Sequence, residues 1–288
     1  MLNADNYKVE VVHLVWIPLG FEVFKNFIDS YKENAAGYDH SLTIVFNGAV
    51  NGSETDEYLE YAKSLGVHHN SLFFSSGQDI DHYFNAARNS IADLLIFLNS
   101  YSVILANDWL KKYVSAFETD ASIGIVGSSG SYQSYYSSVY QKHPWKWEGS
   151  KGFNYNFKKY KLFAKAFLYW RFLFKPFPDP HLRTNAFMLR RTDMLVLKKG
   201  KLAKKIDAYR FESGRESMTA QIISNGLNVL VIDKAGNLYQ EDQWDASKTF
   251  WIGEQENLIV SDNQTRIYDN ANAEEKKQMT WLAWGKNA

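Results

Sequence analysis

Short apolar runs alternate with helical patterns along the first half of the chain. Apolar runs bounded by polar residues or glycine predict buried strands at residues 11–17, 42–46, 72–74, 94–98 and 123–126. Between these runs, apolar residues recur at helical spacing and predict helices at residues 21–31, 58–65, 81–92 and 108–117. Because strands separated by helices need crossover connections, this half predicts an α/β fold: a mostly parallel, Rossmann-like central sheet flanked by helices.

The second half departs from this alternation. Residues 127–152 are rich in Ser, Tyr and Gly and predict a long loop of the kind that carries function. An aromatic, lysine-flanked helix is expected at residues 155–175, with five aromatic residues on one face: Tyr160, Phe163, Phe167, Trp170 and Phe174.

The rest of the chain predicts fewer elements. We expect a strand at residues 186–189, a helix at 216–225 that ends at Gly226, and a last buried strand at 229–232. From Trp244 onward the sequence predicts an irregular tail that ends in a short helix at residues 273–284. No segment has the composition of a linker, so the chain is expected to form one integrated domain.

Composition removes several classes of function. The 288 residues include no cysteine, which excludes a disulfide scaffold, a thiolate zinc site, an iron–sulfur cluster and a cysteine nucleophile. The 32 Lys+Arg balance the 32 Asp+Glu, so binding of long nucleic acid by bulk electrostatics is not expected. The polar amino terminus lacks a signal-peptide pattern, and the longest apolar stretch, residues 162–174, is too short to span a bilayer. We therefore expect a cytoplasmic protein, soluble or peripheral to a membrane.

Polar residues follow the predicted strands, where α/β sheets bind ligands. Pro18 and Leu19 follow the first strand, Asn47 the second, and Asp79 the third. An acidic residue at a strand end, such as Asp79, suits hydrogen bonding to a base or ribose. The fourth strand is followed by Asn99, Ser100 and Tyr101, which either face a ligand or form an ordinary turn.

Residues 207–216 carry most of the candidate chemistry of the second half. They supply three acids and two arginines ahead of a predicted helix, so a carboxylate can act as a general base and a guanidinium can meet a phosphate. The alternative is an acidic turn with surface ion pairs. The seven histidines have no zinc-ligand spacing, and neither a dinucleotide G-x-G-x-x-G nor a P-loop motif is present. These absences weaken the zinc, redox and P-loop interpretations.

The order of these motifs resembles that of the GT-A glycosyltransferases, particularly the family 2-like group, over residues 11–233. In that family the first three strand-end positions hold the nucleotide. The resemblance therefore implies donor contacts by seven residues: Pro18, Leu19, Asn47, Asp79, Asn99, Ser100 and Tyr101. It also implies a single GT-A-like domain in which residues 1–135 bind the nucleotide-sugar, and residues 136–288 form the acceptor-binding half with a C-terminal, acceptor-side extension.

The chain departs from that family at the end of the fourth strand. The family has an Asp-x-Asp motif there that holds a divalent cation on the diphosphate, whereas Asn99-Ser100-Tyr101 has no carboxylate. A Mn²⁺ or Mg²⁺ cofactor is therefore in doubt, since such cations prefer anionic oxygen ligands. Either Asn99 or Tyr101 holds the cation together with the diphosphate, or a basic residue replaces it. We favour replacement, by Arg215, Arg183 or Lys248.

An acidic residue ahead of the last helix deprotonates the acceptor in the same family. The resemblance implies Glu212 or, counted back from Gly226, Glu216 as this base, with Arg215 between them. Acceptor contacts are expected from Arg183, Asn185 and Trp244. The implied reaction is an inverting transfer of a hexosyl or deoxyhexosyl group from a nucleotide-sugar to a glycan or lipid-linked acceptor, in cell-surface polysaccharide synthesis. The alternative is a non-catalytic protein that binds nucleotide or glycan.

The aromatic helix at residues 155–175 admits two interpretations. It is either an amphipathic helix packed on the body of the protein, or a membrane-surface or lipid-linked acceptor site, because cations beside an aromatic face suit anionic headgroups. The second interpretation would place the protein at the inner face of the membrane.

Overall fold

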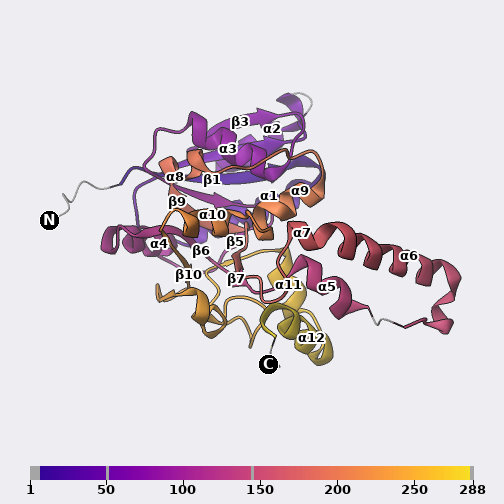
Figure 1. Cartoon of the computed structure of the whole chain (residues 1–288). Coiled ribbons are helices and arrows are strands. Elements are labelled where there is room, and N and C mark those ends of the chain that lie inside the picture. Colours follow the sequence, from indigo (N-terminus) through magenta and orange to yellow (C-terminus); the bar gives the residue numbers. More distant parts are fainter. Residues whose placement is uncertain (1–6, 50–51, 144–145, 286–288) are drawn as a thin grey trace.

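A mixed sheet of eight strands forms the centre of the computed structural model, which describes residues 7–49, 52–143 and 146–285 (Figure 1). The strand order is β11-β10-β6-β9-β4-β1-β2-β3. The strands are β1 (Val9–Trp16), β2 (Ser41–Asn47), β3 (Asn70–Phe74), β4 (Leu94–Leu98), β6 (Ile123–Gly127), β9 (Ala186–Arg190), β10 (Asn228–Ile232) and β11 (Leu238–Tyr239). The expected α/β fold with a mainly parallel sheet is confirmed.

One internal strand, β9, runs antiparallel to both of its neighbours, β4 and β6. The chain leaves β6 at the carboxyl edge of the parallel strands, builds further elements there, and returns from the same edge into β9. The residues just before β9, from His181 to Asn185, therefore lie at the edge where an α/β sheet binds ligands.

Helices cover both faces of the sheet. The first face is covered by α1 (Phe21–Glu33), α2 (Asp56–Ser64) and α4 (Trp109–Thr119), and the second by α3 (Asp79–Asn89), α8 (Arg191–Val196), α9 (Lys205–Ser213) and α10 (Met218–Ser224). Side chains of a strand alternate between these faces, so Val11 and Val15 of β1 pack on the first and Val12 and Leu14 on the second. Strands buried on both faces explain the continuous apolar runs in the sequence.

The segment from Trp244 onward is more ordered than the sequence predicted. It contains η5 (Glu241–Ser247), β12 (Val260–Ser261), α11 (Asn263–Asp269) and α12 (Ala273–Trp284), and β12 pairs with β5 (Val103–Ile104). The expected helix at residues 273–284 is confirmed. Five aromatic side chains insert this segment into the core on the second face: Trp244, Phe250, Trp251, Tyr268 and Trp284. Irregular backbone with large buried rings produces no hydrophobic period, so the sequence did not indicate that this segment is ordered.

The predicted loop at residues 127–152 is partly wrong. It contains β7 (Gly130–Ser131), which pairs with β8 (His181–Leu182), and the helix α5 (Tyr135–Lys142). Ser134 caps α5, because its hydroxyl accepts a hydrogen bond from the Ser137 amide at 3.0 Å. Serine favours caps as well as loops, so the Ser-rich composition suggested a loop where a capped helix forms.

An arm projects from the body at the level of α5 (Figure 1). It continues from α6 (Gly152–Lys165) through a π turn at Ala166–Trp170 into α7 (Arg171–Leu173). Phe163, Trp170 and Phe174 are buried as expected, but Phe167 is 53% exposed. The wide π turn shifts the buried seam by one residue, so Ala166 takes the place expected for Phe167.

The region around Glu212 also differs from its prediction. Residues 205–213 form α9, where the sequence indicated a turn, and α10 begins only at Met218 behind the Ser217 cap. Phe211 is the one large apolar residue of α9 that is fully buried, so the helix has little of the periodicity that reveals an amphipathic helix.

Candidate active site at the carboxyl edge of the sheet

The loops after β1, β2 and β4 lie against one another. The Trp16 amide donates a hydrogen bond to the Ser100 hydroxyl at 3.1 Å, and the Asn47 side-chain amide donates to the Gly77 carbonyl at 3.2 Å. Gly48 has a φ of +90°, and a Cβ atom there would lie 3.3 Å from Pro18. The structure thus brings Pro18, Asn47 and Ser100 to one edge. Asn47 and Ser100 are buried and use these bonds to hold the loops.

The other expected donor residues lie at the same edge in different surroundings. Leu19 lies beside Ser100 in a small recess, and Tyr101 receives a hydrogen bond from Arg266 on its carbonyl oxygen at 3.1 Å. Asp79 is the first residue of α3 and remains open to solvent, yet the surrounding protein raises the pKa of its carboxyl by desolvation.

Tyr83 links Asp79 to the second half of the chain. Its hydroxyl is buried and has no hydrogen-bond partner in the part of the chain that the structure describes. Burial raises the pKa of Tyr83 well above its usual value, and the negative charges of Asp79 and Glu212 raise it further. Asp79 of α3 and Glu212 of α9 thus both lie near enough to Tyr83 to raise its pKa. The expected donor residue and the expected base therefore belong to the same region.

A cavity of about 390 Å³ opens beside the end of β4. Its walls come from Asn99, from residues 131–142, from residues 181–185, from α9 through Tyr209 and Glu212, and from residues 250–264. Ligand sites commonly have volumes of about 300 to 1,000 Å³. The structure thus brings together Asn99, Glu212, Arg183 and Asn185, which the sequence had assigned to three different roles.

Glu212 presents its carboxylate to this cavity from the last turn of α9. The Thr184 hydroxyl donates a hydrogen bond to Glu212 Oε2 at 3.1 Å and orients the side chain. The carboxylate is half-buried and has no ion pair among the residues that the structure describes. An oriented, unpaired carboxylate is suited to accept a proton from a bound hydroxyl.

Glu216 and Arg215 lie elsewhere. Both are exposed and line a second cavity, of about 480 Å³, with Arg210 and Lys198. The Arg215 guanidinium donates to the Arg171 carbonyl oxygen at 3.1 Å. Because α9 ends before these residues, they face a different part of the surface from Glu212. Of the two candidate bases, only Glu212 lines the cavity at the end of β4.

His181 is a further proton acceptor in the cavity, which the sequence analysis missed. Its Nδ1 atom lies 2.7 Å from the Asp179 carbonyl oxygen, which can only accept, so Nδ1 carries the proton and Nε2 is the acceptor of the neutral ring. Burial lowers the pKa of His181, although the negative charge of Glu212 opposes this effect. No sequence pattern marked this histidine, because its partner is a backbone carbonyl.

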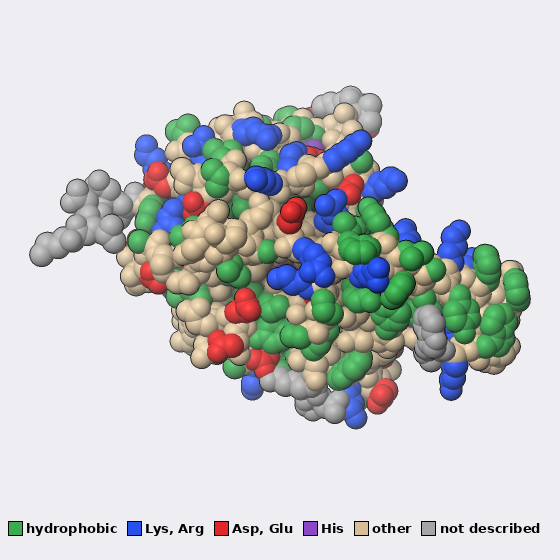
Figure 2. Space-filling view, viewed as in Figure 1, with side chains coloured by type: hydrophobic (Ala, Val, Ile, Leu, Met, Phe, Trp, Pro, Cys, Tyr) green, Lys and Arg blue, Asp and Glu red, His purple; other side chains and the backbone are tan. Residues whose placement is uncertain are grey.

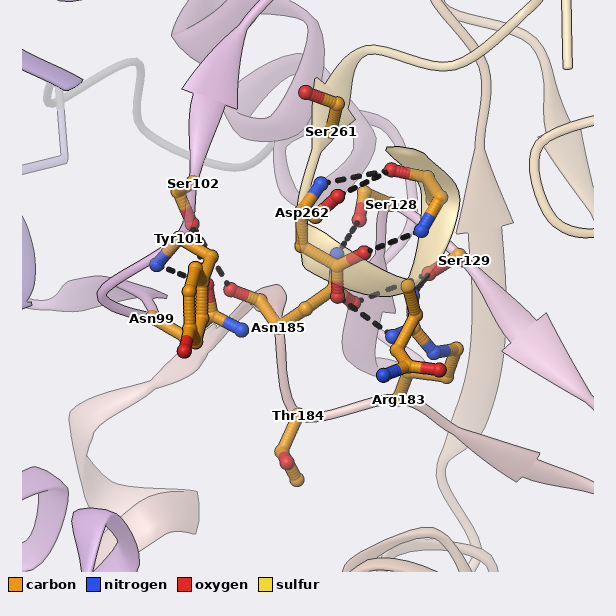
Figure 3. A network of polar contacts seen from close by, with 12 residues as sticks. Asn99, Tyr101, Ser102, Ser128, Ser129, Arg183, Thr184, Asn185, Ser261 and Asp262 are labelled. Atoms are coloured by element: carbon orange, nitrogen blue, oxygen red, sulfur yellow. Dashed lines mark hydrogen bonds and ion pairs between the residues drawn. The ribbon is translucent and has the colours of Figure 1, made fainter. Parts of the chain in front are cut away.

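Arg183 and Asn185 line the cavity and also belong to a network of polar contacts (Figure 3). The Arg183 guanidinium donates to Asp262 Oδ2 at 2.6 Å and to the Ser129 hydroxyl at 3.2 Å, and it lies 4.1 Å from the centroid of the Phe250 ring. The Asn185 amide donates to Ser128 and accepts from Ser129. The Arg183 charge is thus neutralised within the protein, which argues against Arg183 as the group that replaces a cation on a diphosphate.

Lys142 is the cation that the cavity does offer. It comes from the last turn of α5, remains open to solvent, and has no ion pair in the described ranges. The surrounding protein lowers the pKa of its ammonium group by desolvation. The expected alternative, Lys248, forms an ion pair with Glu256 at 2.8 Å and does not line the cavity. Sequence analysis passed over Lys142 because it fell in the predicted loop.

The end of β4 does not fit a divalent cation. Asn99 Oδ1 accepts hydrogen bonds from the Tyr101 amide at 3.0 Å and from the Ser102 hydroxyl at 3.2 Å, and the Ser100 hydroxyl already accepts from Trp16. Across residues 7–49, 52–143 and 146–285, no group of three or more His, Asp or Glu side chains could hold a metal ion. Neutral oxygens that are already bonded are poor ligands for Mn²⁺ or Mg²⁺.

Trp244 does not reach the cavity. Its side chain is fully buried, and a Cβ atom on Gly130 would lie 2.5 Å from its ring. The ring fills the space that this glycine leaves open, so Trp244 packs in the core instead of contacting an acceptor. Its neighbour in the same core, Trp251, does line the cavity.

Among solved structures, the chain is similar to glycosyltransferases at low sequence identity. No protein-family model and no curated protein sequence matches the chain. The mannosyltransferase PcManGT from Pyrobaculum calidifontis, solved with GDP-Man and Mn²⁺, is 11% identical over 97% of this chain and 70% of that chain, with a TM-score of 0.49. GalNAc-T7, solved with UDP, GalNAc and Mn²⁺, is 14% identical over 43% of this chain and 23% of that chain, with a TM-score of 0.36.

TarS 1–349 of S. aureus is 12% identical over 42% of this chain and 34% of that chain, with a TM-score of 0.33. The chain thus spans about a quarter of the GalNAc-T7 chain and a third of the TarS chain in these alignments. Similarity at this level assigns no residue and no activity. What the structure itself establishes is an α/β protein with a polar cavity, lined by Glu212, at the carboxyl edge of its sheet.

Proposed function

We propose that the chain is a glycosyltransferase that transfers a sugar from a nucleotide-sugar donor to an acceptor hydroxyl. The observation that carries this proposal is the oriented, unpaired Glu212 carboxylate in a cavity whose wall also includes Asn99 at the end of β4. The same wall contains Tyr135, Tyr209, Phe250 and Trp251, of which the partly exposed Tyr135 and Tyr209 offer apolar faces against which a sugar ring can pack. The sequence resemblance to GT-A enzymes supports the same reaction class.

The proposed step is an inverting displacement. Glu212 takes the proton of the acceptor hydroxyl while that oxygen forms a bond to the anomeric carbon of the donor sugar. The bond from the anomeric carbon to the diphosphate oxygen breaks, and its electron pair leaves with the nucleoside diphosphate. Lys142 supplies positive charge for the developing negative charge on the leaving group. No part of this step uses a metal ion.

Binding of the two substrates divides between the halves of the chain in this proposal. Pro18, Leu19, Asn47 and Asp79, within residues 1–135, lie along the edge assigned to the nucleotide, and residues 136–288 supply most of the cavity wall. The acceptor is a glycan or lipid-linked saccharide, the transferred group is a hexosyl or deoxyhexosyl unit, and the setting is polysaccharide synthesis at the cytoplasmic face of a membrane.

A second candidate function is a non-catalytic protein that binds a nucleotide or a glycan. The neutral residues at the end of β4 favour it, because they leave a bound diphosphate with fewer charged contacts than Asp-x-Asp and a cation would provide. This candidate keeps the cavity and the edge residues but assigns no reaction to Glu212.

One experiment separates the two functions. Calorimetry with UDP, GDP and dTDP, with and without Mn²⁺, identifies the nucleotide, and release of nucleoside diphosphate from matching nucleotide-sugars is then measured. The glycosyltransferase proposal expects binding and slow donor hydrolysis, because water can replace the acceptor. Binding without any release, also in the presence of saccharide acceptors, would favour the non-catalytic protein. A control with Asp79→Asn, which keeps the shape of the edge, tests whether binding occurs at the proposed donor site.

A further inference from the structure

The arm exposes an unusual number of large apolar side chains. Six of its side chains, and that of Trp147 just before it, are more than half exposed: Trp147, Phe153, Phe157, Phe167, Leu168, Tyr169 and Phe172. Figure 2 shows the projecting arm with hydrophobic side chains along it and Lys or Arg side chains beside them. Scattered apolar residues are normal on a protein surface, but so many large ones on a single projecting arm indicate a surface that binds a partner or a membrane.

The exposed side chains form a stripe. Phe153 and Phe157 are four residues apart, and their rings stack with centroids 6.1 Å apart. Leu168 and Phe172 extend the row toward the body of the protein. The opposite side of the arm is already covered, since Phe163, Ala166, Trp170 and Phe174 pack with Val139 of α5. The stripe is therefore the side that the fold leaves without a partner in the described ranges.

The arm is also strongly cationic. Residues 149–178 contain seven Lys or Arg and no Asp or Glu, in a chain whose net charge is zero. Lys158, Lys161 and Lys165 follow one another at helical spacing on the side next to the stripe, and all three are exposed. Only Lys159 is buried in an ion pair, with Glu148 at 2.8 Å. The Arg171 guanidinium lies over Phe167 and Phe172, at 4.4 and 4.6 Å from the ring centroids.

These features select among the occupants of the stripe. A second copy of the arm would bring two cationic rows together, which charge repulsion opposes. A bilayer with anionic headgroups instead accepts aromatic rings at its interface and attracts the neighbouring lysines. In the described ranges, no helix has both the length and the apolar character to cross a membrane. The charge and the aromatic rings of the arm therefore match an anionic membrane surface better than a second copy of the arm.

We propose that the arm docks the protein on an anionic lipid bilayer, with the Phe153–Phe172 stripe in the interface and the lysine row on the headgroups. A helical run of 22 residues is about 33 Å long, so its contact with the surface is extended. At the base of the arm, Tyr135 and Lys142 of α5 line the catalytic cavity. The docked arm thereby holds the cavity next to the membrane. This inference concerns binding and does not depend on the proposed catalytic role of Glu212.

Vesicle sedimentation of the full chain tests the proposal. The vesicles contain either phosphatidylcholine alone or a mixture of phosphatidylcholine and phosphatidylglycerol. We expect sedimentation with the anionic vesicles, little with the neutral ones, and release by high salt. Phe153→Ser with Phe157→Ser should weaken binding at least about tenfold, and Lys158→Gln, Lys161→Gln and Lys165→Gln about fivefold for each charge removed. All five positions are exposed, so the variants should keep the fold, as circular dichroism can check.

Matched controls lie away from the arm. Ile91 is 85% exposed and Lys63 is exposed on α2, so Ile91→Ser and Lys63→Gln change surface apolarity and charge without touching the stripe. They should bind vesicles as the unmodified chain does. Equal binding to neutral and anionic vesicles, or unchanged binding by the arm variants, would overturn the proposal. So would a dimer in light scattering that the Phe153→Ser and Phe157→Ser variant dissociates, since the stripe would then bind a second copy.

Discussion

The Arg183–Asp262 ion pair allows a quantitative test of how the C-terminal segment is held at the wall of the cavity. The two side chains are 10% and 1% exposed, and their charged atoms lie 2.6 Å apart. Asp262 also caps α11, because its Oδ1 accepts a hydrogen bond from the Thr265 amide at 2.9 Å. Removing one partner of a buried pair costs about 3 to 5 kcal/mol, because the other charge is left buried without compensation. Asp262→Asn keeps a capping oxygen but removes both the negative charge and the acceptor of the Arg183 hydrogen bond.

A double-mutant cycle measures the coupling. We expect Asp262→Asn and Arg183→Met each to lower the free energy of unfolding by about 3 kcal/mol or more, while the double variant loses less than the sum by at least about 2 kcal/mol. Urea unfolding followed by tryptophan fluorescence gives the free energies of unfolding of all four proteins, provided that the m value stays constant. Additivity within about 0.5 kcal/mol would refute the idea that Asp262 neutralises Arg183, and Arg183 would again be available to a diphosphate.

Three further predictions concern buried or cavity-lining charges. The buried His13 ring stacks on Phe27 with centroids 3.5 Å apart, and burial lowers the pKa of His13 to about 3. Unfolding restores a pKa near 6.5, so the free energy of unfolding should fall by up to roughly 5 kcal/mol as the pH drops from about 6.5 to about 3. The urea midpoint of His13→Phe should depend less on pH over this range. Burial raises the pKa of Asp179 to about 7, so the folded protein should lose stability as the pH rises from about 4 to about 7 and this buried carboxyl ionises. Asp179→Asn should therefore raise the melting temperature at pH 8. An unchanged or lower melting temperature would show that the carboxylate is not a buried charge. Lys142→Gln should weaken nucleoside-diphosphate binding about tenfold in calorimetry, whereas Lys63→Gln should leave it unchanged. Equal effects of the two substitutions would show that Lys142 does not contact the diphosphate.

The sequence predicted those elements whose signals are local. Val12 and Phe97 sit in strands buried on both faces, which produce uninterrupted apolar runs, and Gly226 ends α10 with a φ of +77° as a helix-terminating glycine does. The helix α9 was missed because its single large buried residue, Phe211, gives no period. Such a helix is stabilised by tertiary contacts, which a single sequence does not display.

The candidate site was predicted in part, because only some of its residues have local signals in the sequence. Glu212 and Asn99 stood at recognisable positions relative to strands and glycines, and the structure places both in one cavity. His181 and Lys142 carried no motif, because the role of His181 depends on a backbone partner and that of Lys142 on the position of α5 in the fold. Trp244 was misplaced because a tryptophan in an irregular segment gives no indication of whether it packs inward or faces a ligand.

The central claim is that Glu212 is the proton acceptor of a sugar transfer, and Glu212→Gln tests it most directly. Glutamine keeps the Thr184 hydrogen bond but cannot take the proton. With the nucleotide-sugar that the unmodified chain turns over, we expect kcat to fall by about 10² to 10⁴ while calorimetry shows donor affinity within about twofold. Glu216→Gln, in the second cavity, is the matched control and should keep its activity. Unchanged turnover by Glu212→Gln, or loss confined to Glu216→Gln, would contradict the account.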